Sequence, residues 1–216
     1  MFPISDSIPS RKFPLVNIFL ILITSYVFFK ELSAPSPDGF INQFALIPSL
    51  VNFNNFNTLI PFVSAIFLHG GWLHILSNMW FLWIFGDNVE DYFGHLTYLF
   101  LYFIFGIAGN LLQYFLMPTS TIPMLGASGA IAGVLGAYFV LYPYSRVKTL
   151  VPIFFFFTFI DIPAFIMLGY WFVLQIFSGA GSLSVASSGG IAFFAHIGGF
   201  VTGAVIASLF KKKTTY

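Results

Sequence analysis

Two residues in this 216-residue sequence, Ser128 and His196, are of the types that form a nucleophile and its base. Both lie in apolar stretches, where a polar side chain costs free energy and is therefore a candidate for function. A serine hydroxyl is a weak nucleophile until a base removes its proton, and neutral histidine is the usual base. No carboxylate falls at a comparable position in these stretches, so we expect a Ser–His dyad rather than a triad.

His74 and Asn78 are a second pair of candidates. They are four residues apart, so a helix places them on one face. Both side chains can donate to a carbonyl oxygen that becomes negatively charged, although a polar pair that merely holds two helices together is an equally good interpretation. A metal site is not expected, because His69 and His74 are five residues apart, no HExxH motif or nearby acidic residue occurs, and the chain has no cysteine.

Small residues surround both members of the dyad and allow a second interpretation of Ser128. On helices, Gly129, Gly133 and Gly136 share one face, and Gly199 and Gly203 share a face with His196. This is the small-xxx-small pattern of closely packed membrane helices, in which a serine simply permits packing. The two interpretations are compatible, because close backbones also bring a serine and a histidine together. The other polar residues in the apolar stretches are His69, Asn110 and Gln113, and we expect His69 to be structural or interfacial and His95 to be a surface residue.

The elements that must position these residues are transmembrane helices. Hydrophobic residues make up 58% of the chain and charged residues only 7%, against about 25% charged in soluble domains. We therefore predict an all-α, polytopic membrane protein in a lipid bilayer. Six spans are expected, at residues 13–29, 66–86, 95–116, 127–143, 160–178 and 191–210. Residues 30–65 are expected to form a long interfacial loop, and residues 1–12 and 211–216 to be tails on either side of one domain over residues 13–210.

The predicted spans place the candidate residues at one depth. The second, fourth and sixth spans run in the same direction, so their N-terminal ends, with His74, Ser128 and His196, lie toward the same face. The fourth span begins near Ser128 and ends at Pro143, and its roughly 24 Å falls short of the ~30 Å of a hydrocarbon core. Ser128 is therefore expected below the membrane surface, at a helix N-terminus whose free N–H groups suit a developing oxyanion.

Basic residues predict the orientation, because they gather on the cytoplasmic side. An even number of spans with a cytoplasmic N-terminus puts seven of the eight basic residues inside and leaves only Lys30 outside. The seven are Arg11, Lys12, Arg146, Lys148, Lys211, Lys212 and Lys213. Both termini are thus expected in the cytoplasm, and we expect a prokaryotic cell (inner) membrane. The short apolar run 151–159 is expected at the interface before the fifth span, and Asp161 is expected to be an interface residue.

Four blocks of the sequence resemble the rhomboid family of intramembrane serine proteases. They are His69-Gly-Gly-Trp-Leu-His74-Ile-Leu-Ser-Asn78, Gly86-Asp-Asn-Val-Glu90, Gly126-Ala-Ser128-Gly129-Ala and Ala195-His196-Ile-Gly-Gly199-Phe-Val-Thr-Gly203. They occur in the family's order, and the resemblance covers about residues 13–210. It implies a six-helix rhomboid-like bundle that acts as a serine endopeptidase, with Ser128 as nucleophile and His196 as general base. It also implies oxyanion stabilisation by the Ser128 backbone N–H, His74 and Asn78.

The resemblance also implies partners and a gate. Substrates would be single-span transmembrane proteins, cut within the lipid bilayer; no cofactor, metal or nucleic acid is expected. The gate would be the fifth span with the loop after it, which together hold Gly179, Gly181, Gly189 and Gly190.

Two departures from the family pattern bear on the site. Many members have an aromatic residue one turn after the serine, against which the histidine packs, whereas this chain has Ala132. Phe193 or Phe194 is the expected substitute. The chain also lacks a Trp-Arg pair that some members carry in the first loop. The competing functions are a non-catalytic rhomboid-like protein that binds membrane helices and a six-span transporter. Against the transporter, the sequence shows no convincing internal repeat.

Overall fold

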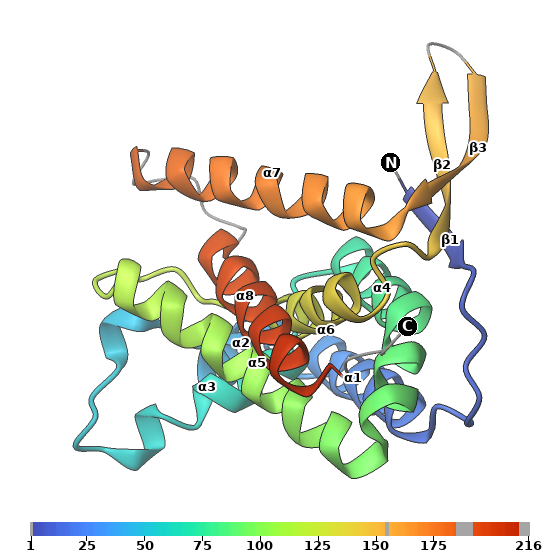
Figure 1. Cartoon of the computed structure of the whole chain (residues 1–216). Helices are drawn as coiled ribbons and strands as arrows, with labels where there is room; N and C mark the ends of the chain where they lie inside the picture. Colours follow the sequence, from blue (N-terminus) through green and yellow to red (C-terminus); the bar gives the residue numbers. More distant parts are fainter. Residues whose placement is uncertain (1, 154–155, 185–191, 212–216) are drawn as a thin grey trace.

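The computed structural model describes residues 2–153, 156–184 and 192–211, and it is mostly helical (Figure 1). The long helices are α1 (Leu15–Leu32), α4 (Trp72–Phe93), α5 (His95–Leu116), α6 (Ser128–Leu141), α7 (Ala164–Ser184) and α8 (Phe193–Phe210). Between α1 and α4 lie the short helices α2 (Pro37–Phe44) and α3 (Pro61–Ser64), with three 3₁₀ turns at Pro48–Leu50, Phe56–Thr58 and Ala65–Phe67. The predicted all-α membrane fold is confirmed.

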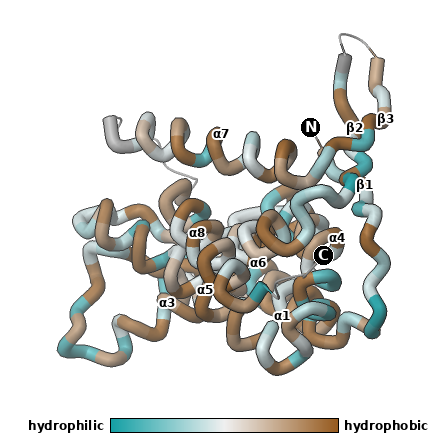
Figure 2. Tube along the Cα trace, viewed as in Figure 1, coloured by the Kyte–Doolittle hydropathy of each residue, from teal (hydrophilic) through white to brown (hydrophobic). Residues whose placement is uncertain are grey.

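Each predicted span corresponds to one long helix, but not every helix is long and apolar enough to cross a bilayer. Four are long and apolar enough by themselves: Leu15–Leu32, His95–Leu116, Ala164–Ser182 and Phe193–Phe210. A fifth is a bent pair, Phe56–Phe67 with Trp72–Phe93, whose axes differ by 78°. Helix α6, with 14 residues, is about 21 Å long. The helices are mostly apolar, and strongly hydrophilic residues gather in the segment after β1 and in the connection before α3 (Figure 2). The count of six spans stays a prediction.

The second span is displaced from its predicted bounds, 66–86. Helix α4 begins only at Trp72, because Gly71 has a φ of +150°, which other residues rarely adopt, and breaks the chain direction there. At the other end α4 continues to Phe93. It therefore includes Asp87, Glu90 and Asp91, which lie beyond the predicted end of the span at residue 86. Glu90 can be buried there because its carboxylate accepts from the backbone N–H groups of Val16 (2.9 Å) and Asn17 (2.7 Å) and so caps the start of α1.

A three-stranded antiparallel sheet was not predicted. Strands β2 (Arg146–Ile153) and β3 (Phe156–Pro163) form a hairpin, and β1 (Phe2–Asp6) from the expected N-terminal tail pairs with β2. Arg146 and Pro163 are register partners at the base of the hairpin, and Phe2 pairs with Leu150. Residues 160–163 therefore belong to β3 rather than to the fifth span, and α7 starts directly after them. The hairpin projects away from the helices (Figure 1).

The centre of the molecule is the contact between α6 and α8, which rests on glycine. A Cβ atom placed on Gly199 would lie 1.9 Å from the backbone oxygen of Gly129, and one on Gly203 would lie 1.9 Å from that of Gly133. No other residue fits at these two positions without moving a backbone. The close approach predicted from the glycine spacing is present, and it brings the first turns of the two helices together.

Candidate active site

Ser128 and His196 meet at the point where α6 and α8 begin. Ser128 is the first residue of α6, and His196 lies in the first turn of α8. The Ser128 Oγ and the His196 Nε2 are 2.7 Å apart, a hydrogen-bond distance. The pairing that the sequence suggests as a dyad is thus present as a contact. The glycine contacts between α6 and α8 lie next to this pair along the two helices, and both residues line a cavity.

Buried polar contacts fix the start of α8 and therefore the position of His196. The side-chain oxygen of Gln113, on α5, accepts hydrogen bonds from the backbone N–H groups of Phe194 (3.0 Å) and Ala195 (3.3 Å). Both groups belong to the first turn of α8, where N–H groups lack the usual partner one turn earlier, and the Ala195 N–H is shared with the carbonyl of the N-cap residue Ala192 at 3.0 Å. Gln113 was a candidate in sequence for its depth alone, and its observed contacts make it a helix cap.

Gly126 adapts the chain before Ser128 to the site. Its φ is +127°, and its N–H donates to the carbonyl of Ala65 at 2.9 Å. A Cβ atom on this residue would lie 2.8 Å from His74 Nε2 and 3.6 Å from Ser128 Oγ. A side chain here would therefore be strained and would occupy the space between the two functional groups. This position explains the first glycine of the Gly126-Ala-Ser128 block.

His74 and Asn78, one turn apart on α4, line the same cavity as Ser128 and His196. The cavity has a volume of about 730 Å³. The N–H of Gly70 lies 3.4 Å from His74 Nδ1, which leaves Nε2 as the nitrogen that faces Gly126 and can donate. Asn78 is only 7% exposed, and its Nδ2 is buried without a hydrogen-bond partner among the described residues. His74 Nε2 thus lies near the space beside Ser128 Oγ, and Asn78 lines the same cavity.

The other polar candidates have structural contacts. Asn110 donates to the carbonyl of Phe62 at 2.9 Å, which ties α5 to α3. His69 is fully buried, with its ring 4.9 Å from that of His74, rather than interfacial. The half-exposed ring of His95, expected at the surface, contacts the buried Glu90 at 2.5 Å. Within residues 2–153, 156–184 and 192–211, no three His, Cys, Asp or Glu side chains are grouped as metal ligands.

A contact that the sequence does not reveal supports the far side of the His196 ring. Gln175, on α7, has its Oε1 2.8 Å from His196 Nδ1. Trp171, one turn earlier, has its ring 5.9 Å from the imidazole at an angle of 33°. Phe193, one of the two expected substitutes for the missing aromatic residue, has its ring 6.5 Å away at 84°. Ala132 lines the cavity and leaves this role to α7.

Comparisons with known proteins find matches to one family. A family model described as the Rhomboid domain matches residues 57–213. The chain is 38% identical over 87 residues to Rhomboid-like protein 11, chloroplastic, of Arabidopsis thaliana, which is 40% of this chain and 31% of that protein. It is 35% identical over 116 residues to Rhomboid-like protease 5 of Toxoplasma gondii, covering 52% of this chain and 12% of that protein. Rhomboid protease GluP of Bacillus subtilis is 39% identical over 75 residues, 35% of this chain and 14% of its own length. The matches thus span less than a third of each of these three relatives.

Proposed function

The chain belongs to the rhomboid family, and on this premise we propose that it is a serine endopeptidase that cuts transmembrane substrates with Ser128 and His196. It is an integral membrane protein, and its family includes relatives named as proteases. The observation that carries the proposal is the 2.7 Å distance between Ser128 Oγ and His196 Nε2 beside a cavity of about 730 Å³. In a purely structural role, neither residue would need to face a cavity.

The proposed reaction follows from this contact. His196 Nε2 takes the hydroxyl proton of Ser128 while Oγ bonds to the substrate carbonyl carbon, and the carbonyl electron pair moves to its oxygen. When the C–N bond breaks, the leaving amine takes the proton from His196. Water then attacks the acyl-enzyme by the same proton transfers and releases the acid. The negative oxygen of each tetrahedral intermediate is held by the Ser128 N–H, His74 and Asn78.

The substrate class follows from the setting of the site. Apart from its two histidines, the described residues that line the cavity include no acidic or basic side chain, and apolar side chains such as Phe81, Ile131 and Leu135 dominate its walls. Such a cavity suits an unwound, apolar peptide segment, and with the family resemblance we propose single-span transmembrane proteins as substrates. The cytoplasmic termini, which the basic residues predict, and the prokaryotic membrane both stay predictions.

The test is cleavage of a single-span model substrate in liposomes by the unmodified protein, Ser128→Ala and His196→Ala. We expect each variant to lose cleavage while it inserts and unfolds at the normal temperature. A serine-reactive phosphonate should label the unmodified protein and not Ser128→Ala. Undiminished cleavage by either variant, or binding of the substrate without any cleavage by the unmodified protein, would favour a non-catalytic helix-binding function.

A further inference from the structure

The nitrogen of His196 that does not face Ser128 has a partner on a different helix. His196 Nε2 contacts Ser128, and Nδ1 lies 2.8 Å from Gln175 Oε1 on α7. We propose that Gln175 is a positioning residue, which fixes the tautomer and the ring orientation of His196 for its reaction with Ser128. This inference rests on the proposed peptidase function.

Proton positions follow from the chemistry of the two side chains. An amide oxygen only accepts, so the hydrogen between the two residues belongs to His196 Nδ1. A neutral imidazole has a single N–H, and Nε2 is then unprotonated. Its lone pair points at the Ser128 hydroxyl, which is what a general base requires. In the other tautomer Nε2 would carry the hydrogen and could not take up the serine proton.

The same contact matters after proton transfer. When Ser128 gives its proton to Nε2, the imidazole becomes a cation that donates from both nitrogens. The Gln175 oxygen then accepts a charge-assisted hydrogen bond, which is stronger than the neutral one. Gln175 itself gains and loses no proton. It thereby takes the orienting position that a carboxylate holds in a Ser-His-Asp triad, without placing a charge in the membrane.

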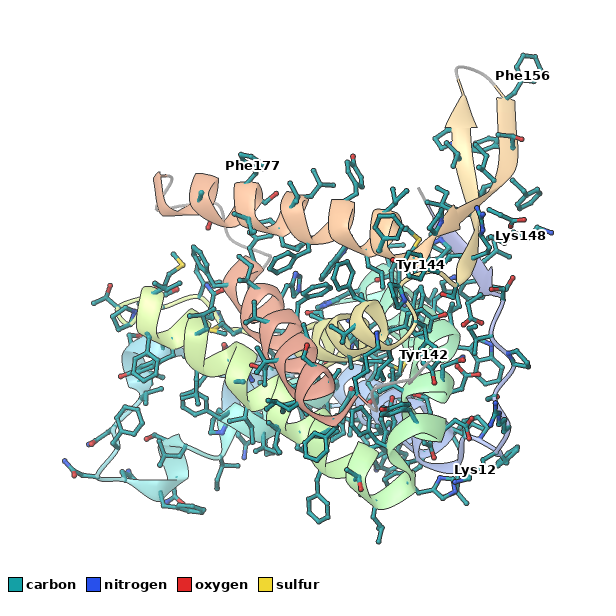
Figure 3. All side chains as sticks on the ribbon, in the orientation of Figure 1. Lys12, Tyr142, Tyr144, Lys148, Phe156 and Phe177 are labelled. Atoms are coloured by element: carbon teal, nitrogen blue, oxygen red, sulfur yellow. The ribbon has the colours of Figure 1, made fainter. Side chains whose placement is uncertain are left out.

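Neighbouring contacts show why this support comes from α7. Trp171 lies four residues before Gln175, so both side chains project from one face of α7 onto the imidazole. On α6, Ala132 offers the ring no aromatic surface. The opposite face of α7 is exposed: Phe177 is 72% exposed and points away from the other helices (Figure 3). Gln175 is thus a polar residue turned inward from an otherwise apolar helix.

The test compares Gln175→Leu, Gln175→Glu and the control Phe177→Leu in the full-length protein, with a single-span substrate in liposomes. Gln175→Leu removes the acceptor but leaves the base itself in place, so kcat should fall roughly 10- to 10²-fold, at or below the ~10²–10⁴-fold that a positioned acid–base group contributes, while KM changes little. Gln175→Glu keeps an acceptor at Nδ1 and should retain most of the activity. Phe177→Leu changes the lipid-facing side of the same helix and should leave kcat unchanged.

A spectroscopic measurement separates positioning from a purely structural role. The ¹⁵N imidazole shifts of His196, identified by their loss in His196→Ala, should report the Nδ1–H tautomer in the unmodified protein and in Gln175→Glu. They should report a mixture in Gln175→Leu. If Gln175→Leu is poorly folded, Gln175→Met offers a side chain of similar length for both measurements. An unchanged tautomer with normal kcat in the Leu or Met variant would overturn the inference, even where Ser128→Ala and His196→Ala abolish cleavage. Activity that survives in those two variants would instead overturn the proposed function.

Discussion

At the scale of residues, the site is distinguished by one side-chain donor, the amide of Asn78, that has no hydrogen-bond partner among the described residues. Several buried polar atoms lack a partner among the described residues, and of the residues that carry them only Asn78 lines the cavity. An unpaired buried donor costs free energy in the resting protein. That cost is understandable if the donor is used when a carbonyl oxygen becomes negative beside Ser128.

Replacement of Asn78 tests this interpretation. Asn78→Ala should lower kcat about 10- to 10³-fold, around the range for losing one oxyanion donor. KM should change little, because the uncharged carbonyl of the bound substrate depends less on this donor. Asn110→Ala is the matched control, since Asn110 is equally buried but already bonded to the Phe62 carbonyl. It should lower the unfolding temperature and leave kcat per folded molecule nearly intact. The reverse pattern in the two variants would assign Asn78 to packing.

At the scale of elements, the glycine contacts between α6 and α8 set the distance between Ser128 and His196. Gly199→Ala would place a methyl group 1.9 Å from the Gly129 oxygen. The methyl carbon is fixed directly to the backbone of α8, and the oxygen belongs to the backbone of α6. The two helices must therefore separate, at a cost of about 1–3 kcal/mol. We expect a lower unfolding temperature together with a lower kcat.

A second glycine on a long helix provides the control for this prediction. A Cβ on Gly181, in α7, would meet nothing within 4 Å. Gly181→Ala should therefore leave the unfolding temperature equal or slightly higher, because alanine favours helix by about 1 kcal/mol. Equal changes in unfolding temperature for the two substitutions would show that the close contact between α6 and α8 does not determine stability.

The stability that the contact between β1 and α6 contributes to the fold should depend on pH. Asp6, at its end, accepts a hydrogen bond from the Tyr138 hydroxyl on α6. Burial, with a smaller contribution from the charge of Asp87, raises the pKa of the Asp6 carboxyl from 3.8 to about 6. The folded protein therefore holds this proton more tightly than the unfolded chain does. The stability that protonated Asp6 contributes is complete below about pH 4 and is lost as the pH rises through 6.

Thermal unfolding at several pH values checks this sign. The unfolding temperature of the unmodified protein should fall between pH 4.5 and 7, relative to that of Asp6→Asn. In the variant, an uncharged amide oxygen still accepts from Tyr138 at every pH. Parallel curves for the two proteins would exclude Asp6 as the titrating group.

The elements differ in how far the sequence predicted them. The helices followed from long apolar runs, and Ser128, His196, His74 and Asn78 were identified because polar groups are rare in such runs. Gln175 met the same criterion within the predicted fifth span and was missed. Its role depends on the rotation of α7 about its axis, which spacing within one helix does not define. The sheet was missed because its pairing joins residues 2–6 to 147–150, and no local pattern reports a partner so distant. Gly189 and Gly190 of the expected gate and residues 212–216 of the C-terminal tail lie outside the described residues.

At the scale of the whole molecule, the sheet constrains the topology. Because β1 pairs with β2, residues on both strands must lie on one side of the membrane. An even number of crossings must therefore separate them, and the long helices between them are α1, α4, α5 and α6. The short α6 thus has to count as a crossing if the other three do. With α7 and α8 this agrees with six spans. Lys12 and Lys148 lie toward the end of the molecule that holds β1, and α2 and α3 lie at the opposite end (Figures 1 and 3).

Cysteine labelling tests this topology, and the absence of native cysteine makes single sites unambiguous. A membrane-impermeant thiol reagent added to intact cells should react with a cysteine at Asp38. It should not react with one at Lys12 or Lys148 until the cells are opened. Labelling of Lys12→Cys and Lys148→Cys from opposite sides would contradict the β1–β2 pairing, and labelling of both from outside would reverse the predicted orientation.

The β1–β2 pairing also sets the timing of biogenesis. Residues 2–6 leave the ribosome roughly 150 residues before their partners, which at ~5–20 residues per second is a wait of roughly 7–30 s. Throughout that interval four helices must insert while an N-terminal strand with unpaired N–H and C=O groups stays available on one side of the membrane. Any event that carries this strand across the bilayer, or pairs it with another nascent chain, would prevent the sheet from forming. Assembly of this protein therefore includes a late docking step, in which residues 2–6 reach their final place only after the four helices between the two strands have been made.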